Sequence, residues 1–169
     1  MDSNLKTIVW HQFGAAIDML DNAISACPDQ LWNAALWNNP EEEAGYSQFW
    51  FIAYHTLFWL DLYLTGSSEG FVPPAPFVRG RLPEQPYTKD QVQTYLVQCR
   101  RKCQATIEGL TDEKANQLCK FEWIECSFLE LQLYSMRHVQ EHAAQLSLLI
   151  GRNDVTATDW VTQAKSEPA

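Results

Sequence analysis

The sequence predicts an all-α fold, a four-helix bundle with long connections. Four long stretches carry apolar residues at helical spacing, helix start and stop signals separate them, and no stretch clearly predicts a strand. At 169 residues the chain is long enough to bury a core as one domain. We expect residues 1–152 to form the bundle and residues 153–169 to form a polar C-terminal tail with Trp160 as its anchor.

The first long helix is expected over residues 4–26 and is closed by Cys27-Pro28, because the residue before a proline disfavours helical geometry. Its apolar stripe consists of Leu5, Ile8, Val9, Phe13, Ala16, Ile17, Leu20 and Ile24. A shorter helical piece is expected over residues 29–37, with its tryptophans packed against the bundle. Asn38-Asn39-Pro40 then interrupts the helical pattern.

The second long helix is expected over residues 47–64 and ends near Gly66. The connection that follows, residues 65–87, contains five prolines and three glycines. A loop this long is uncommon inside a compact domain, and it typically serves as a lid, a binding loop or a crossover. Its aromatic residues predict that it packs against the bundle.

The third long helix begins at Thr88, which can form a capping box with Gln91. One face of this helix carries Val92, Leu96, Cys99, Cys103, Ile107 and Leu110. A further short helix is expected over residues 112–119, after Thr111 as its N-cap.

The fourth long helix has the clearest boundaries. Ser127 and Glu130 form a second capping-box pattern at its start, and Gly151 supplies its stop. One stripe of this helix carries Leu131, Tyr134, His138, His142, Gln145 and Leu149. The helix therefore presents two histidines to the interior of the predicted bundle.

Charge and composition exclude several classes of function. The net charge of −9 argues against nucleic-acid binding, and the only dense basic stretch, Arg100-Arg101-Lys102, is expected to be a solvated helix face. The longest apolar stretch, residues 49–60, is too short to span a bilayer, and the N-terminus has no signal-peptide pattern. We therefore expect a cytoplasmic protein with no membrane partner.

The five cysteines are expected to be reduced, because no secretion signal precedes them. Cys99 and Cys103 lie four residues apart on an apolar stripe, which favours core packing over metal binding. Cys119 and Cys126 lack the spacing of a zinc knuckle, and a disulfide between them is not expected in a reducing compartment.

Three of the four histidines can converge on one metal ion. His138 and His142 are spaced four apart and share a helix face, and His55 lies within the aromatic second helix. If these two helices are antiparallel, His55 and His142 lie at about the same height. Three imidazoles leave coordination positions open, as in a catalytic rather than a structural metal site.

Two other interpretations compete with this metal site. Each histidine can be a packed imidazole that is hydrogen-bonded to a carbonyl or hydroxyl group. HVQEH also matches the HxxEH string of inverzincins, which would make Glu141 a catalytic residue. That class requires a further carboxylate ligand downstream, for which only Asp154, Asp159 and Glu167 remain. Glu141 is the one candidate for a catalytic side chain.

The segments IAYHTLFWLDLYL and MRHVQEHAAQLSLLIGR resemble the motifs of the DinB-like superfamily, also described as YfiT-like metal-dependent hydrolases. That family is a four-helix bundle with one histidine ligand in its second helix and an HxxxH pair in its fourth. The resemblance covers roughly residues 5–152 and implies that His55, His138 and His142 are the ligands. The family often has HxxxHxGQ, whereas this chain keeps Gln145 and has Ala144 in place of the glycine.

The resemblance implies a metal-dependent enzyme that acts on a small molecule. Relatives include S-transferases that use bacillithiol, mycothiol or glutathione, so a low-molecular-weight thiol is a candidate cofactor beside hydrolysis. Three histidines suit zinc, nickel, iron or manganese. The competing expectation is a non-catalytic metal- or ligand-binding bundle.

Two further expectations concern the aromatic residues, one for the surroundings of the histidines and one for the assembly of the protein. An apolar pocket is expected from Phe51, Phe58, Trp59, Tyr134 and Gln145. The surplus aromatic surface makes a homodimer a candidate assembly.

Overall fold

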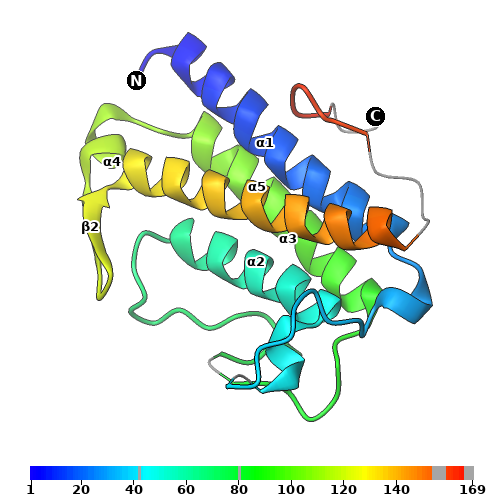
Figure 1. The fold of residues 1–169 in the computed structure, drawn as a ribbon. Coiled ribbons are helices and arrows are strands. Elements are labelled where there is room, and N and C mark those ends of the chain that lie inside the picture. Colours follow the sequence, from blue (N-terminus) through cyan, green and yellow to red (C-terminus); the bar gives the residue numbers. More distant parts are fainter. Residues whose placement is uncertain (42, 80, 154–158, 166–169) are drawn as a thin grey trace.

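Four long helices pack side by side around one core, as predicted (Figure 1). The computed structural model describes residues 1–41, 43–79, 81–153 and 159–165. The long helices are Ser3–Ala26 (α1), Phe49–Tyr63 (α2), Lys89–Glu108 (α3) and Phe128–Arg152 (α5). Helix α1 contacts α3 and α5, and α2 contacts the same two helices. Helices α1 and α5 run in one direction, and α2 and α3 run in the other.

The long connection between α2 and α3 is a crossover, because these two helices point the same way and the chain must return along the bundle (Figure 1). This loop packs against the bundle, as its aromatic content predicted. The Tyr54 hydroxyl donates to the Val78 carbonyl oxygen at 2.5 Å, and the Val78 amide donates to the Tyr87 hydroxyl at 3.0 Å. Phe77 stacks on both Tyr54 and Tyr95.

The predicted helix boundaries hold where a cap fixes them. Thr88 and Gln91 form both hydrogen bonds of the capping box at the start of α3. The Ser127 hydroxyl accepts from the Glu130 amide at 3.3 Å and caps α5. Gly151 does not stop α5, which continues to Arg152 with Asn153 as its C-cap.

The prediction of a helix over residues 29–37 was wrong. Only Asp29–Leu31 (η1) forms a single 3-10 turn, and Ala35 pairs with Gln48 in an isolated bridge. The carbonyl oxygens of Trp32 and Ala34 accept the first amides of α2, from residues 50 and 49, at 3.1 and 2.9 Å. The segment is extended because it supplies acceptors that this helix end would otherwise lack. A second 3-10 turn, Ala44–Ser47 (η2), leads into α2.

The fold is mostly helical, as predicted, but a small two-stranded hairpin that was not predicted lies between the last two helices. The short helix after Thr111 ends at Asn116 (α4, Asp112–Asn116), and a hairpin of Leu118–Phe121 (β1) and Ile124–Ser127 (β2) follows it. Alternate residues of β1 are buried, so a four-residue strand fits the local pattern better than a helix. Its side chains pack on α2: Phe121 contacts Tyr63 edge-on, at 5.5 Å between ring centroids.

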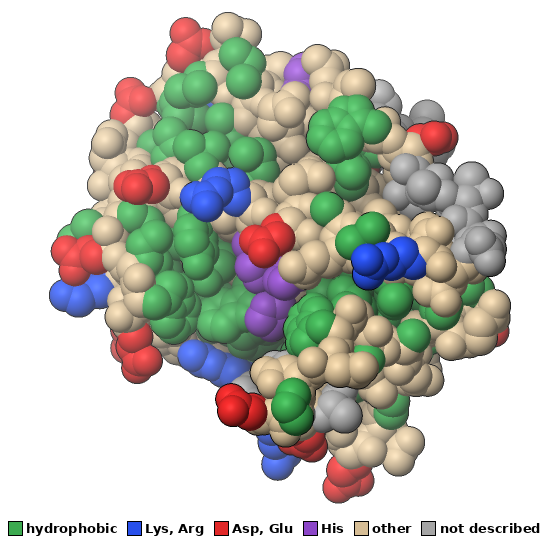
Figure 2. Space-filling model, viewed as in Figure 1, with side chains coloured by type: hydrophobic (Ala, Val, Ile, Leu, Met, Phe, Trp, Pro, Cys, Tyr) green, Lys and Arg blue, Asp and Glu red, His purple; other side chains and the backbone are tan. Residues whose placement is uncertain are grey.

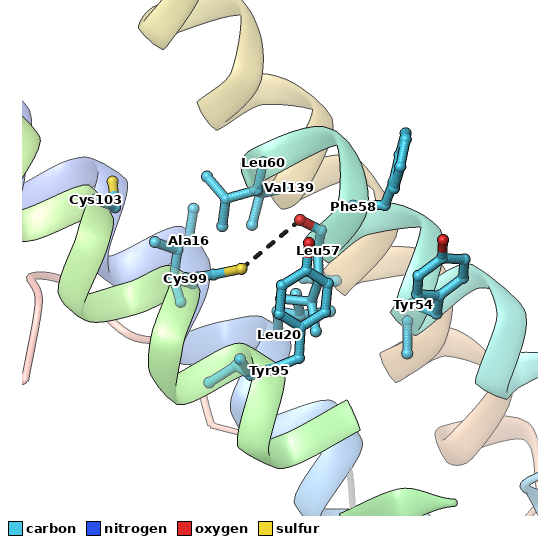
Figure 3. Packing of buried hydrophobic residues seen from close by; sticks show 14 of the residues in the cluster. Ala16, Leu20, Tyr54, Leu57, Phe58, Leu60, Tyr95, Cys99, Cys103 and Val139 are labelled. Carbon is cyan, nitrogen blue, oxygen red and sulfur yellow. Dashed lines mark hydrogen bonds between the residues drawn. The ribbon is translucent and has the colours of Figure 1, made fainter. Parts of the chain in front are cut away.

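Cys99 and Cys103 are core residues, as predicted. Both are at most 1% exposed, and Figure 3 shows the Cys99 thiol pointing toward the Leu57 carbonyl oxygen, 3.7 Å away. Burial raises the pKa of both thiols. The pair therefore fills space in the core, and no metal-ligand group among the described residues includes either thiol.

The C-terminal segment 159–165 packs along α1. The Ala164 amide donates to the His11 carbonyl oxygen at 2.8 Å, and the Lys165 amide donates to the Asp18 carboxylate at 2.6 Å. Trp160 is 70% exposed, so the expectation that it anchors the tail was wrong. Backbone hydrogen bonds to α1 hold the segment instead.

Within the described residues, every helix is too short or too polar to cross a lipid bilayer.

Candidate metal centre

Helices α2 and α5 bring three histidines together. His55 lies in the middle of α2, and His138 and His142 lie one turn apart on α5. The Nε2 atom of His138 is 3.3 Å from that of His55 and 3.0 Å from that of His142. The two helices run antiparallel (Figure 1), which is the arrangement expected to place His55 and His142 at about the same height.

Gln145 determines which nitrogen of His142 is free. Its side-chain oxygen lies 2.7 Å from His142 Nδ1, and a carbonyl oxygen can only accept a hydrogen bond. His142 Nδ1 therefore carries the proton, and Nε2 directs its lone pair toward His138. This is the tautomer in which Nε2 can bind a metal ion.

Hydrogen bonds among the three rings cannot satisfy all three Nε2 atoms. His138 Nε2 lies within hydrogen-bond distance of both neighbours, but it can carry only one proton. One cation would accept a lone pair from each ring. A metal–nitrogen bond of about 2.1 Å separates neighbouring ligand atoms by about 3.0 Å in an octahedral site and about 3.4 Å in a tetrahedral one. The distances of 3.0 and 3.3 Å fit these values.

The environment keeps the rings of His55 and His138 neutral. Burial and, to a smaller extent, the neighbouring His142 lower the pKa of His55 to about 4. Burial also lowers the pKa of His138 to about 3, with contributions from His142 and His55. Since both values lie well below neutral pH, these imidazoles are in the form that binds metal.

The histidine cluster opens into an aromatic cavity of about 480 Å³. Figure 2 shows the histidines at the edge of a hollow whose surface is mostly hydrophobic. Its described lining residues are Trp37, Tyr46, Phe51, Ile52, Tyr54, His55, Phe58, Trp59, Arg79, Arg81 and His142. The volume is within the range of small-molecule sites.

A comparison with known families decides how the chain is classified. The sequence profile of the DinB superfamily matches residues 12–146, a span that contains all three clustered histidines. The chain belongs to the DinB superfamily. The resemblance predicted from the histidine motifs is thereby confirmed. Neither a curated protein nor a solved structure matched significantly.

In this DinB-superfamily chain, the five predicted pocket residues have different positions. Phe51, Phe58 and Trp59 line the cavity. Tyr134 is not among its described lining residues and packs edge-on against Tyr63, at 5.6 Å between ring centroids. Gln145 lies behind His142 and orients it.

Glu141 is separate from the cavity of the DinB-superfamily site. It is exposed, and it lines a different cavity beside Val161. Among the described residues, no carboxylate joins the three histidines, and Asp154 and Glu167 lie outside those residues. The geometry gives no support to the inverzincin interpretation.

Sequence reasoning missed the contribution of the connections to the cavity. Trp37 and Tyr46 precede α2, and Arg79 and Arg81 lie in the crossover. Helical periodicity cannot place residues in irregular segments, because it carries no information about where a loop packs. The available signal was the pair of arginines inside a loop rich in proline and aromatic residues.

Proposed function

We propose that this protein is a metal-dependent enzyme in which His55, His138 and His142 bind one divalent cation. The observation that carries the proposal is the convergence of three imidazole nitrogens, one from each histidine and all within 4.8 Å of one another, at the edge of an aromatic cavity. Zinc, nickel, iron and manganese all suit three imidazoles. A bound cation would act as a Lewis acid that lowers the pKa of a coordinated water or thiol.

The surrounding residues have definable roles in this proposal. Gln145 holds the His142 proton at Nδ1 and so keeps Nε2 available. Phe51, Phe58 and Trp59 bind the apolar part of a substrate and exclude water from it. His55 and His142 line the cavity, so the cation they hold would face a bound substrate.

The reaction that we favour is the transfer of a thiol, supplied by an external small molecule, to an electrophilic substrate. No cysteine or carboxylate lies among the described residues that line the cavity. All five cysteines are buried, and burial raises the pKa of each thiol. The protein therefore offers no thiolate of its own at the site, and a low-molecular-weight thiol would supply the nucleophile. Hydrolysis is the other reaction that such a centre supports.

The same observation favours a second function, a non-catalytic binding module. A cavity whose described lining has no carboxylate or thiol has few groups for proton transfer. In that case the histidines would hold a metal or ligand without turnover.

Metal loading tests the site. Untagged protein is stripped, incubated with each of the four metals and analysed by elemental analysis after gel filtration. We expect one equivalent in the wild type and in His11→Ala, which removes the histidine outside the cluster, and loss of loading in His138→Ala and His142→Ala. Equal loading in all of these proteins would overturn the assignment.

Turnover distinguishes an enzyme from a binding module. Loaded protein is assayed with thiols of several types and hydrophobic electrophiles, and with hydrolysable esters and amides. We expect thiol consumption that is lost in His138→Ala. Stoichiometric metal without turnover of any of these compounds would favour the binding module.

A further inference from the structure

Two arginines lie at the cavity that holds the histidines. Arg79 and Arg81 belong to the crossover between α2 and α3, and both line the cavity together with His55 and His142. Both arginines are exposed, so their guanidinium groups are accessible from solvent. Figure 2 shows basic side chains bordering the hydrophobic hollow beside the histidines.

The charge at this cavity is opposite to that of the whole chain. The protein has 21 acidic and 12 basic residues, for a net charge of −9. Among the described residues that line the cavity, two are arginines and none is acidic. Neither arginine forms an ion pair with an acidic group in the described part of the chain. The local positive potential of the two arginines attracts anions to the cavity, although the protein as a whole is acidic.

The crossover holds the arginines close to the aromatic wall. Tyr54, which lines the cavity from α2, donates a hydrogen bond to the carbonyl oxygen of Val78, the residue before Arg79. The Tyr87 hydroxyl accepts from the Val78 amide, so both backbone groups of Val78 are fixed to aromatic side chains. These hydrogen bonds fix the backbone of the loop next to Arg79 against the bundle.

We propose that the site binds a small molecule that has an apolar body and an anionic group. Arg79 and Arg81 bind the anion, which is a carboxylate, a sulfonate or a phosphate, because planar guanidinium groups pair with such oxygens through two parallel hydrogen bonds. The apolar body lies against Phe51, Phe58 and Trp59. The position of the reacting end at the histidines rests on the proposed function, whereas recognition of the anion does not.

Binding of matched probes to metal-free protein tests the proposal. The probes are 2-naphthoate, naphthalene-2-sulfonate and the neutral 2-naphthamide. The signal is the change in tryptophan fluorescence on binding, to which Trp37 and Trp59 in the cavity wall contribute. We expect at least one anion to bind about tenfold more tightly than the amide, the effect of one charged hydrogen-bonding pair. Equal affinity for all three probes would overturn the proposal.

Substitutions locate the source of the preference. The double variant Arg79→Ala, Arg81→Ala should lose the preference for anions and keep the affinity for the amide. The double variant Arg79→Lys, Arg81→Lys should keep part of the preference for anions, because lysine retains the charge but not the planar geometry of a guanidinium group. Arg137→Ala is the matched control, because this exposed arginine lines the cavity on the other side of α5, and it should retain the full preference. A preference that survives removal of Arg79 and Arg81 would refute the assignment.

A cation at the histidine cluster would also attract anions, and its contribution can be separated from that of Arg79 and Arg81. The same titrations are made with His138→Ala and with metal-loaded wild type. The preference should persist in metal-free protein and in His138→Ala. If it appears only after metal loading, the cation binds the anion and the inference fails, although the proposed metal site stands. If metal does not load and the preference persists, the proposed function fails and the inference stands.

Discussion

Gln145 controls the chemistry of His142 through a single hydrogen bond. The amide oxygen fixes the proton on Nδ1, and the lone pair of Nε2 points into the cluster. Partners of this kind orient metal-binding histidines and raise their basicity. At the scale of one residue, this hydrogen bond leaves His142 Nε2 available to the proposed metal ion.

Gln145→Ala should weaken metal binding by roughly 10- to 100-fold, because His142 would lose the acceptor that sets its tautomer. Competition titration against a chelator of known affinity measures the change. Gln145→Glu is the control: it retains an acceptor oxygen and should bind metal at least as well as the wild type. An affinity that is unchanged in Gln145→Ala would contradict this role.

The metal-free protein should lose stability as the pH falls from about 6.5 to about 4. His55 and His138 have pKa values of about 4 and about 3 when folded, against about 6.5 in an unfolded chain. In this window the unfolded chain binds protons that the folded protein does not, so acid favours unfolding. We expect a loss of about 3 kcal/mol for each histidine.

Urea denaturation at several pH values measures this effect. The slope of stability against pH should be smaller in His55→Gln and His138→Gln, which keep polar side chains of similar size but do not titrate. Identical slopes in the wild type and both variants would show that these histidines titrate normally when folded.

At the scale of elements, the crossover contributes a buried aromatic side chain to the core. Phe77 is 7% exposed and stacks on Tyr54 and Tyr95, with Tyr87 also in contact. Because Tyr54 lines the cavity, the same aromatic cluster links the loop to the proposed site.

Phe77→Ala should lower the free energy of unfolding by about 3–5 kcal/mol, the cost of removing a buried aromatic ring. Val72→Ala in the same loop is the control, because Val72 is 79% exposed and its loss should change stability by less than about 0.5 kcal/mol. Chemical denaturation of both variants measures the difference. Equal, small effects would mean that the loop does not contribute to the core.

At the scale of the whole molecule, the proposed metal site would join two helices whose association the core must otherwise maintain. His55 comes from α2, whereas His138 and His142 come from α5. A ligand that binds only the folded state stabilises it by mass action. Metal should therefore stabilise the entire bundle.

At a metal concentration about 100 times the dissociation constant, the gain should be about 2.7 kcal/mol, which raises the Tm by roughly 5–10 °C for a domain of this size. Thermal unfolding with and without metal measures the shift. His11→Ala should show the same increase, and His142→Ala should show none. A similar increase in His142→Ala would place metal binding elsewhere.

The sequence alone determined the features that depend on local spacing. The stripes of the four long helices, the Thr88 and Ser127 caps and the shared face of His138 and His142 follow from the geometry of one helix. These features were predicted because each is set by residues within a few positions of one another.

Only the tertiary structure decided the rest. The meeting of His55 with α5 required the antiparallel packing of two helices that lie far apart in the chain. The extended residues around Ala34 and the hairpin at Cys119 are stabilised by partners on other elements, so local helical propensity mispredicted both. Arg79 and Arg81 reached the cavity because a crossover must return along the bundle, and its path is set by packing and not by periodicity.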